Sequence, residues 1–178
     1  PDVPLQVHAT LAGFQVSIDL SGDSLHKRGY RVAMTEAPLK ETLAAMLLMQ
    51  AGWPSLELPA LVDPMCGSGT FLVEAAWMAA DIAPGINREY YGFLGFSPFD
   101  WAIWKSVREE AMERRQAGLQ KKLPSFYGFD ASEEAVLAAR RNKCATRNGA
   151  ISSGLANCLA RKRDGWMWAV GVNLCLGG

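Results

Sequence analysis

The sequence predicts an α/β fold built on a parallel sheet, and three observations support this prediction. Helical and strand-like segments alternate through the middle of the chain, an order typical of parallel sheets covered by helices. A glycine-containing loop joins a short apolar strand to a helix within 60–76. The chain has 178 residues, 49% of them hydrophobic, which suits one domain with a buried core.

Two short strands are expected first, around a turn at 12–13. Apolar and polar side chains alternate over 14–20, the pattern of a half-buried strand. After a polar stretch, Pro38 suits the first position of a helix, because its missing N–H would have no helical partner there. Leucines and methionines then recur at helical spacing, and the Gly-Trp-Pro sequence at 52–54 ends this helix.

The glycine loop connects a buried strand to a helix, and a second strand and helix follow an insertion. Ser132 is placed to cap the last helix and Gly149 to close it. The expected elements are a strand over Ala60–Asp63, a helix from Thr70 to Ile82, an insertion over Ile86–Leu123 that is helical from Trp101 to Lys121, a strand over Ser125–Asp130 and a helix that ends near Arg147.

Charge and cysteine content argue against several classes of protein. Lys and Arg together number 18, as do Asp and Glu, so no global basic field points to nucleic acid. The 4 cysteines form no CxxC pair, which argues against a zinc site or a disulfide framework and favours the reducing cytoplasm. The sequence has no apolar run of about 18 residues, so we expect no membrane span. Because it has neither a CxxC pair nor a cluster of histidines, we also expect no resident metal.

The glycine loop is the main candidate for a ligand site. It leaves the carboxyl end of a predicted parallel strand, where open α/β sheets bind their ligands. Gly67 and Gly69 allow positive φ angles and close approach of a ligand to the backbone. The helix that follows offers free N–H groups and a partial positive charge. The loop therefore suits a carboxylate or a phosphate.

Four interpretations of this loop remain open from the residues alone. A nucleoside-triphosphate loop needs a lysine after its last glycine, where Thr70 stands. A dinucleotide loop needs a small residue where Leu72 stands and an acid about 20 residues further on. S-adenosylmethionine binding needs an acid at the end of the next strand, and Asp130 offers the ribose two acceptor oxygens. A purely structural turn beside a surface aspartate needs no ligand.

Four segments resemble the THUMP-associated, UPF0020-like family of RNA methyltransferases. "DPMCGSGTFLVEAA" resembles the first motif of the family, and "YGFDASEEAVLAARRN" resembles its acidic second-strand motif. "DLSGDSLHKRGYR" and "APLKETLAAMLL" resemble the segments that precede them. The resemblance covers 5–149 and is strongest to bacterial enzymes that methylate the guanine N2 amine of 23S ribosomal RNA.

The resemblance implies a Rossmann-like domain, here incomplete, that binds S-adenosyl-L-methionine and acts on 23S ribosomal RNA in the cytoplasm. The loop would hold the methionine end of the cofactor, an aspartate before it would face the cationic part, and a second aspartate would bind the ribose. The implied cofactor residues are Asp63, Pro64, Cys66, Gly67, Ser68, Gly69, Thr70 and Asp130, with Thr35, Leu39 and Lys40 from a segment that packs over the cofactor in such enzymes.

The resemblance also implies a division of the chain into three parts. Residues 1–20 resemble the end of a preceding THUMP-like RNA-binding domain, most of which is absent. Residues 21–149 resemble the N-terminal part of the methyltransferase domain. Residues 150–178 form an atypical tail of unknown structure, and we hypothesise that this tail is a truncated or frame-shifted end.

The catalytic signature of this family, Asn or Asp followed by Pro-Pro-Tyr or Pro-Pro-Phe, is missing. Its oxygens accept the hydrogens of the guanine amine while its ring stacks on the base. No proline follows Pro124, so we assign no catalytic residue. One alternative is therefore a cofactor-binding or RNA-binding fragment without activity. Another is an amino-methyltransferase acting on a different nucleic-acid base, against which the THUMP-like lead-in argues.

Three smaller signals accompany these motifs. Lys27, Arg28 and Arg31 would either contact RNA phosphates or belong to a solvated linker. Cys66 has no activating base in view and is interpreted as a small structural residue of the loop. Glu74 lies one helical turn beyond the loop, where a solvated or capping role is expected.

Overall fold

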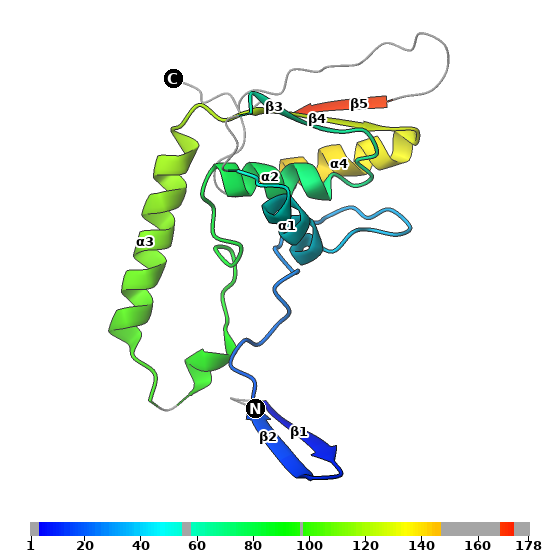
Figure 1. Cartoon of the computed structure of the whole chain (residues 1–178). Coiled ribbons are helices and arrows are strands. Elements are labelled where there is room, and N and C mark those ends of the chain that lie inside the picture. The colour runs from blue at the N-terminus through cyan, green and yellow to red at the C-terminus, as the bar shows by residue number, and fades with distance from the viewer. Residues whose placement is uncertain (1–3, 55–57, 97, 147–167, 173–178) are drawn as a thin grey trace.

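The computed structural model describes residues 4–54, 58–96, 98–146 and 168–172 (Figure 1). The predicted alternation of helix and strand is present through the middle of the chain. The elements are β1 (Leu5–Thr10), β2 (Gly13–Ile18), α1 (Glu41–Gln50), β3 (Ala60–Asp63), α2 (Thr70–Ala79), the 3-10 helix η1 (Gly92–Gly95), α3 (Trp101–Leu119), β4 (Ser125–Asp130), α4 (Glu133–Ala145) and β5 (Trp168–Val172). None of the described helices is both long and apolar enough to cross a bilayer.

The sheet has the strand order β3-β4-β5 in the described part of the chain. β3 and β4 are parallel, as predicted, and Asp63 pairs with Gly128 at one end of the ladder. β5 is antiparallel to β4 and was not predicted, because the tail shows no alternating or flanking pattern that marks a strand. The described residues therefore form a small mixed α/β unit rather than a full Rossmann-like sheet.

Helices α1, α2 and α4 lie on the same side of this sheet (Figure 1). The core between them includes Phe126 from β4 and Leu72 from α2, which are 0% and 2% exposed. Val136 and Ala139 bring α4 into the same cluster. Burial of these side chains is the main term that holds the helices against the sheet, at about 25 cal/mol per Å² of apolar surface.

Helix α1 begins later than the sequence predicted. Pro38 precedes the helix, and Lys40 is the extended N-cap at φ −69° and ψ 138°. The cause is the Arg31 guanidinium, which binds the Leu39 carbonyl and the Glu41 carboxylate and holds this segment extended. At the other end, the predicted stop at 52–54 is confirmed.

Helix α2 ends three residues earlier than predicted. Asp81 adopts a left-handed conformation at φ 53°. The Asp81 N–H donates to the Met78 carbonyl and the Ile82 N–H to the Trp77 carbonyl, at 3.1 and 2.8 Å. These two bonds form a Schellman motif, which closes the helix before Ile82. The predicted end of the last helix near Arg147 and its closure by Gly149 lie outside the described residues.

The strands β1 and β2 form the predicted hairpin, but the expected half-buried face is wrong for this chain. Leu5 pairs with Ile18, and Val7 with Val16, so one face of the hairpin is apolar. Every residue of both strands is nevertheless exposed. The reason is visible in Figure 1, where the hairpin projects away from the sheet and its helices.

Helix α3 extends from the core as a long arm and belongs to the insertion between α2 and β4 (Figure 1). The Asp100 side chain accepts from the N–H groups of Ala102 and Ile103 and caps its start. The C-terminal end of α3 packs against the core, where Gly118 lies so close to Ala80 that a Cβ at Gly118 would overlap the Ala80 carbonyl. The helix ends at Leu119, two residues before the predicted Lys121.

Candidate functional site

Two aspartates mark the carboxyl end of the parallel pair of strands. Asp63 ends β3 and Asp130 ends β4. Because β3 and β4 run in the same direction, their carboxyl ends meet at one edge of the sheet, where open α/β sheets bind ligands. The pKa of Asp63 is raised mainly by burial, and the nearby negative charge of Asp130 contributes to that rise.

The glycine loop lies on this edge and is held there by a hydrogen bond to the Asp130 carboxylate. The Gly67 N–H donates to Asp130 Oδ2 at 2.9 Å, and the Ser132 N–H donates to Asp130 Oδ1 at 2.9 Å. Gly67 and Gly69 have φ angles of +52° and +81°, which side-chain-bearing residues rarely adopt. The glycines that the sequence singled out are therefore required by the backbone.

Asp63 contains a buried acceptor without a donor. Its Oδ1 accepts from the Met65 N–H at 3.1 Å. Its Oδ2 is buried and has no hydrogen-bond partner among the described residues. Burial is the main cause of the raised pKa of Asp63. A buried carboxylate oxygen of this kind is normally satisfied, so the position suits a cationic group of a ligand.

Helix α2 begins directly after the loop and offers the opposite charge. The N–H groups of its first turn have no partner within the helix, and its dipole adds a partial positive charge. No acidic side chain lies in that first turn. The edge therefore pairs an acceptor for a cation with a helix N-terminus that favours an anion.

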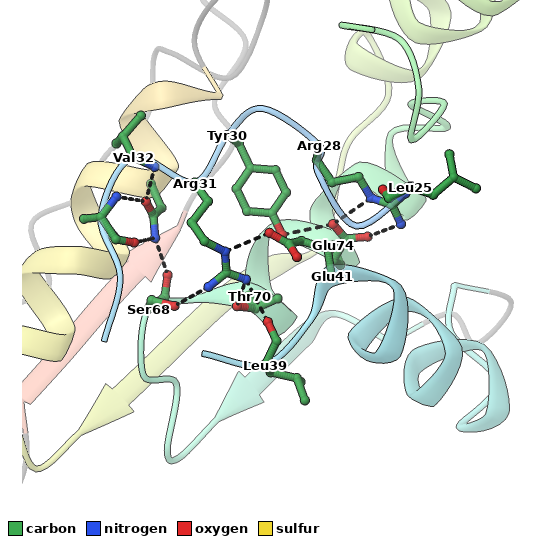
Figure 2. Close-up of polar contacts among 12 residues, drawn as sticks. Leu25, Arg28, Tyr30, Arg31, Val32, Leu39, Glu41, Ser68, Thr70 and Glu74 are labelled. Atoms are coloured by element: carbon green, nitrogen blue, oxygen red, sulfur yellow. Dashed lines mark hydrogen bonds and ion pairs between the residues drawn. The ribbon is translucent and has the colours of Figure 1, made fainter. Parts of the chain in front are cut away.

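Arg31 ties the segment before α1 to the loop (Figure 2). Its Nε donates to Glu41 Oε1 at 2.7 Å, while Nη1 and Nη2 donate to Ser68 Oγ at 3.1 Å and Thr70 Oγ1 at 3.0 Å. Nη2 also donates to the Leu39 carbonyl at 2.7 Å. A single guanidinium thus connects residues from both predicted parts of the cofactor site.

Arg28 belongs to a second buried cluster, also drawn in Figure 2. Its Nε and Nη2 donate to the two oxygens of Glu74, each at 3.3 Å, and the Tyr30 hydroxyl donates to Glu74 Oε1 at 2.9 Å. Glu74 is 3% exposed, so the solvated or capping role expected from the sequence is wrong. Arg28 is 6% exposed and faces inward, not toward solvent where RNA would lie.

Asn142 was not identified from the sequence. It lies on α4, is 1% exposed, and uses all four of its hydrogen-bonding positions. Oδ1 accepts from the N–H groups of Val32 and Ala33, both at 2.8 Å, and Nδ2 donates to the carbonyls of Ala33 and Ser68 at 2.8 and 3.0 Å. A polar residue within the apolar stripe of α4 was the one sequence signal for it.

The remaining predicted residues lie around this edge with different exposure. Cys66 is buried, and burial raises the pKa of its thiol to about 12, so the thiol is neutral near pH 7. Lys27 is exposed and pairs with Asp23 at 3.2 Å, so of the three predicted RNA contacts it alone faces solvent. Thr35 and Leu39 are half-buried, whereas Pro64 and Lys40 are exposed.

The residues present fit a ligand that carries both charges. The unpaired Asp63 oxygen suits a cation, the loop and the start of α2 suit an anion, and Asp130 retains acceptor capacity for hydroxyl groups. No group of three or more His, Cys, Asp or Glu side chains in the described part of the chain is placed to hold a metal.

Comparison with known proteins agrees with this geometry. The family described as "UPF0020: RMKL-like, methyltransferase domain" matches residues 28–160. The chain is 50% identical over 144 residues to the ribosomal RNA large subunit methyltransferase K/L of Desulfotalea psychrophila. The matched region covers 80% of this chain and 20% of that protein. The protein of the same name from Syntrophotalea carbinolica is 51% identical, with the same coverage. The chain spans about a fifth of the length of these relatives.

Solved structures are similar as well. The putative methyltransferase SMU.472, crystallised with SAH, matches with a TM-score of 0.69 and 39% identity over 81% of this chain and 36% of that one. A predicted N6-adenine-specific DNA methylase from Listeria monocytogenes matches with a TM-score of 0.67 and 36% identity, over 82% and 37% of the two chains. The family resemblance predicted from the four motifs is confirmed, and the chain belongs to the family of UPF0020, RMKL-like methyltransferase domains.

Proposed function

We propose that this chain is the cofactor-binding part of an S-adenosylmethionine-dependent methyltransferase that acts on 23S ribosomal RNA. The observation that carries the proposal is the buried, unpaired Oδ2 of Asp63 beside a helix N-terminus. S-adenosylmethionine carries an ammonium, a sulfonium and a carboxylate, so it needs both charges at one site. SAH, the demethylated form of this cofactor, is bound to SMU.472.

In this proposal each part of the cofactor meets a different element. The N–H groups of the first turn of α2, which have no partner within the helix, bind the carboxylate of the methionine part. Asp63 binds the cationic side, and Asp130 binds the ribose hydroxyls through its remaining lone pairs. Pro64, Cys66 and Ser68 shape the loop, and the half-buried Thr35 and Leu39 with the exposed Lys40 cover the site.

When bound, S-adenosylmethionine would supply an electrophilic methyl group, to which a nucleophilic amine would bond as the methyl–sulfur bond breaks, SAH leaves and the amine loses a proton. The residues of this chain bind and orient the cofactor, and orientation of this kind supplies much of the rate enhancement. The Pro-Pro-aromatic signature that would hold the target base is missing from the sequence. We therefore propose that the chain alone binds the cofactor without transferring its methyl group, and that transfer needs the longer protein.

The proposed target is the guanine N2 amine. The relatives named as large subunit methyltransferases support ribosomal RNA, and the four motifs resemble enzymes that methylate guanine. In the longer protein, β3 and β4 would be the first strands of a Rossmann-like sheet, and residues 1–20 the end of a THUMP-like RNA-binding domain. Lys27 remains a proposed phosphate contact, and we place the protein in the cytoplasm. The Listeria neighbour makes an adenine amine the rival target.

Calorimetric titration with S-adenosylmethionine and SAH tests the cofactor proposal. Asp130→Asn is expected to weaken binding, because an amide keeps one acceptor but loses the charge. Asp81→Asn is the matched control, since Asp81 is an aspartate that pairs with Arg114 on α3, away from the loop. A folded chain that binds neither compound would overturn the proposal.

The target is tested with the longer protein and radiolabelled cofactor. Methyl transfer to a 23S ribosomal RNA transcript, followed by nucleoside analysis, should give N2-methylguanosine. Transfer to adenine in DNA at a comparable rate would support the rival target instead. The 178-residue chain serves as the negative control, because it lacks the signature that positions the base.

A further inference from the structure

We propose that Asn142 is a positioning residue that sets the shape of the cofactor site through the backbone. The inference rests on the proposed function, because the site it shapes is the one assigned to S-adenosylmethionine. The four hydrogen bonds of its amide join α4 to two segments distant in sequence, the stretch at 32–33 and the glycine loop. Both segments contain or adjoin predicted cofactor residues.

The bond to the loop fixes the direction of one peptide group. Asn142 Nδ2 donates to the Ser68 carbonyl at 3.0 Å, so that oxygen is directed toward α4. The N–H of the same peptide group, on Gly69, donates to the Cys66 carbonyl at 2.7 Å. With both of its ends bonded, this peptide group cannot turn its oxygen toward the carboxylate of a ligand. The loop thus keeps its carbonyl away from the anionic end of the cofactor.

The bonds to 32–33 position the second segment of the site. Val32 and Ala33 donate their N–H groups to Oδ1, and the Ala33 carbonyl accepts from Nδ2. Arg31 precedes them directly and contacts the Ser68 and Thr70 hydroxyls (Figure 2). Asn142 and Arg31 therefore connect the same segment to the loop through separate hydrogen bonds.

Close packing of α4 against the loop makes this geometry rigid. A Cβ on Gly69 would lie 3.1 Å from the Ala139 Cβ, so the loop backbone touches the helix one turn before Asn142. Ala138 and Ala139 are 5% and 3% exposed, and their small side chains permit this approach. A buried amide with all four hydrogen bonds made favours one arrangement. Breaking any of these bonds would leave a buried polar group without a partner, in protein or in water.

The variant Asn142→Asp gives a readout that loss of stability alone does not. The aspartate keeps the acceptor for Val32 and Ala33 but, when ionised, loses the donors to the Ala33 and Ser68 carbonyls. Affinity for S-adenosylmethionine is expected to fall about tenfold at pH 8. Burial raises the pKa of such a carboxyl, and its protonated form donates one bond again, so the affinity of the variant relative to that of the unaltered chain at the same pH should recover as the pH is lowered.

Glu74→Gln is the control for general destabilisation, because Glu74 lies in a buried polar cluster that does not bond to residues 66–69. Titrations are compared at equal folded fractions. Affinity of Asn142→Asp within twofold of the unaltered chain at pH 8, or a loss equal to that of Glu74→Gln, overturns the inference. A loss confined to Asn142→Asp that recovers at low pH supports it.

Hydrogen exchange separates this inference from the proposed function. In the absence of any ligand, Asn142→Asp is expected to raise exchange at the amides of 67–69, because the Ser68 carbonyl loses its donor, while the later turns of α2 stay protected. If the unaltered chain binds no cofactor but the variant shows this pattern, the proposed function fails and the positioning role stands. Unchanged exchange at these amides overturns the positioning role.

Discussion

The edge of the sheet that bears the glycine loop and the hairpin β1–β2 differ sharply in how their side chains are used. At the edge and in the buried cluster around Glu74 of α2, the side chains of Asn142, Arg28 and Glu74 are all less than 10% exposed, and each is bonded to partners distant in sequence. In the hairpin, Phe14 is 81% exposed, and all residues of both strands face solvent. Polar groups are thus buried in one region while large apolar groups are exposed in the other.

This difference shows which interactions the chain completes by itself. Buried polar groups are costly without partners, and Arg28, Glu74 and Asn142 find theirs within this chain. A two-stranded hairpin whose apolar face stays exposed to water has little to stabilise it, so it is only marginally stable by itself. The loop edge is therefore expected to respond strongly to single substitutions and the hairpin to respond weakly.

The largest effect is expected at the Arg28–Glu74 pair. Glu74→Ala leaves the buried Arg28 guanidinium without its bidentate partner and removes the acceptor of the Tyr30 hydroxyl. Breaking a buried pair in this way costs about 3–5 kcal/mol of unfolding free energy. Urea unfolding followed by tryptophan fluorescence measures it. Arg114→Ala, which removes an exposed pair with Asp81, should change stability far less, and equal losses would contradict the contrast.

Asp63 is expected to give opposite effects on stability and binding. Its folded pKa is raised by burial, so its contribution to folding is present below the unfolded pKa and is lost as the pH rises through the folded pKa. At pH 7 the carboxylate is therefore unfavourable for the unliganded fold. Asp63→Asn keeps the bond to the Met65 N–H and should leave stability equal or higher.

The same variant should weaken S-adenosylmethionine binding about 10- to 100-fold, the usual value of a hydrogen bond to a charged group. In the unaltered chain, affinity should fall as the pH is lowered through the raised pKa of Asp63, because only the carboxylate binds a cation. Titrations at several pH values with both chains measure this. A pH-independent affinity, or a variant that binds normally, would show that Asp63 does not face the cofactor.

Alanine substitutions at two glycines, one in the loop and one in the hairpin, are expected to cause losses of stability of intermediate size. Gly69→Ala places a side chain at φ +81° and within 3.1 Å of the Ala139 Cβ, so we expect a loss of about 2 kcal/mol from backbone strain and crowding. Gly13→Ala is also strained, at φ +139°, but nothing lies within 4 Å of its Cβ. It should disturb the hairpin alone. Thermal unfolding of both variants distinguishes them, and a lower Tm for Gly13→Ala than for Gly69→Ala would contradict the contrast.

Local rules predicted the elements better than the contacts between them. β3 and the cap at Ser132 were predicted correctly because apolar runs, glycines and capping residues act over a few positions. The start of α1 was predicted too early, since the Arg31 guanidinium, which binds the Leu39 carbonyl, acts across several residues. β5 was missed because the tail shows no alternating or flanking pattern that marks a strand.

The candidate site was predictable to a similar extent. Gly67, Gly69, Asp63 and Asp130 follow from the position of a loop after a strand and of acids at strand ends, and the structure brings them to one edge. Asn142 and the burial of Glu74 could not be predicted in the same way. Their roles depend on partners 44 to 110 positions away, and helical spacing alone does not distinguish a buried polar residue from a solvated one.

The smallest effect is expected in the hairpin. Phe14→Ser removes the largest apolar side chain of an uncovered face, at a position that is 81% exposed. Surface substitutions of this kind change the unfolding free energy by less than about 0.5 kcal/mol. No tryptophan lies in the hairpin, and Trp53 and Trp77 are buried in the core, so urea unfolding followed by tryptophan fluorescence does not report on the hairpin. A loss above about 1 kcal/mol would mean that this face is covered in solution, and the two regions would then differ less than their exposures indicate.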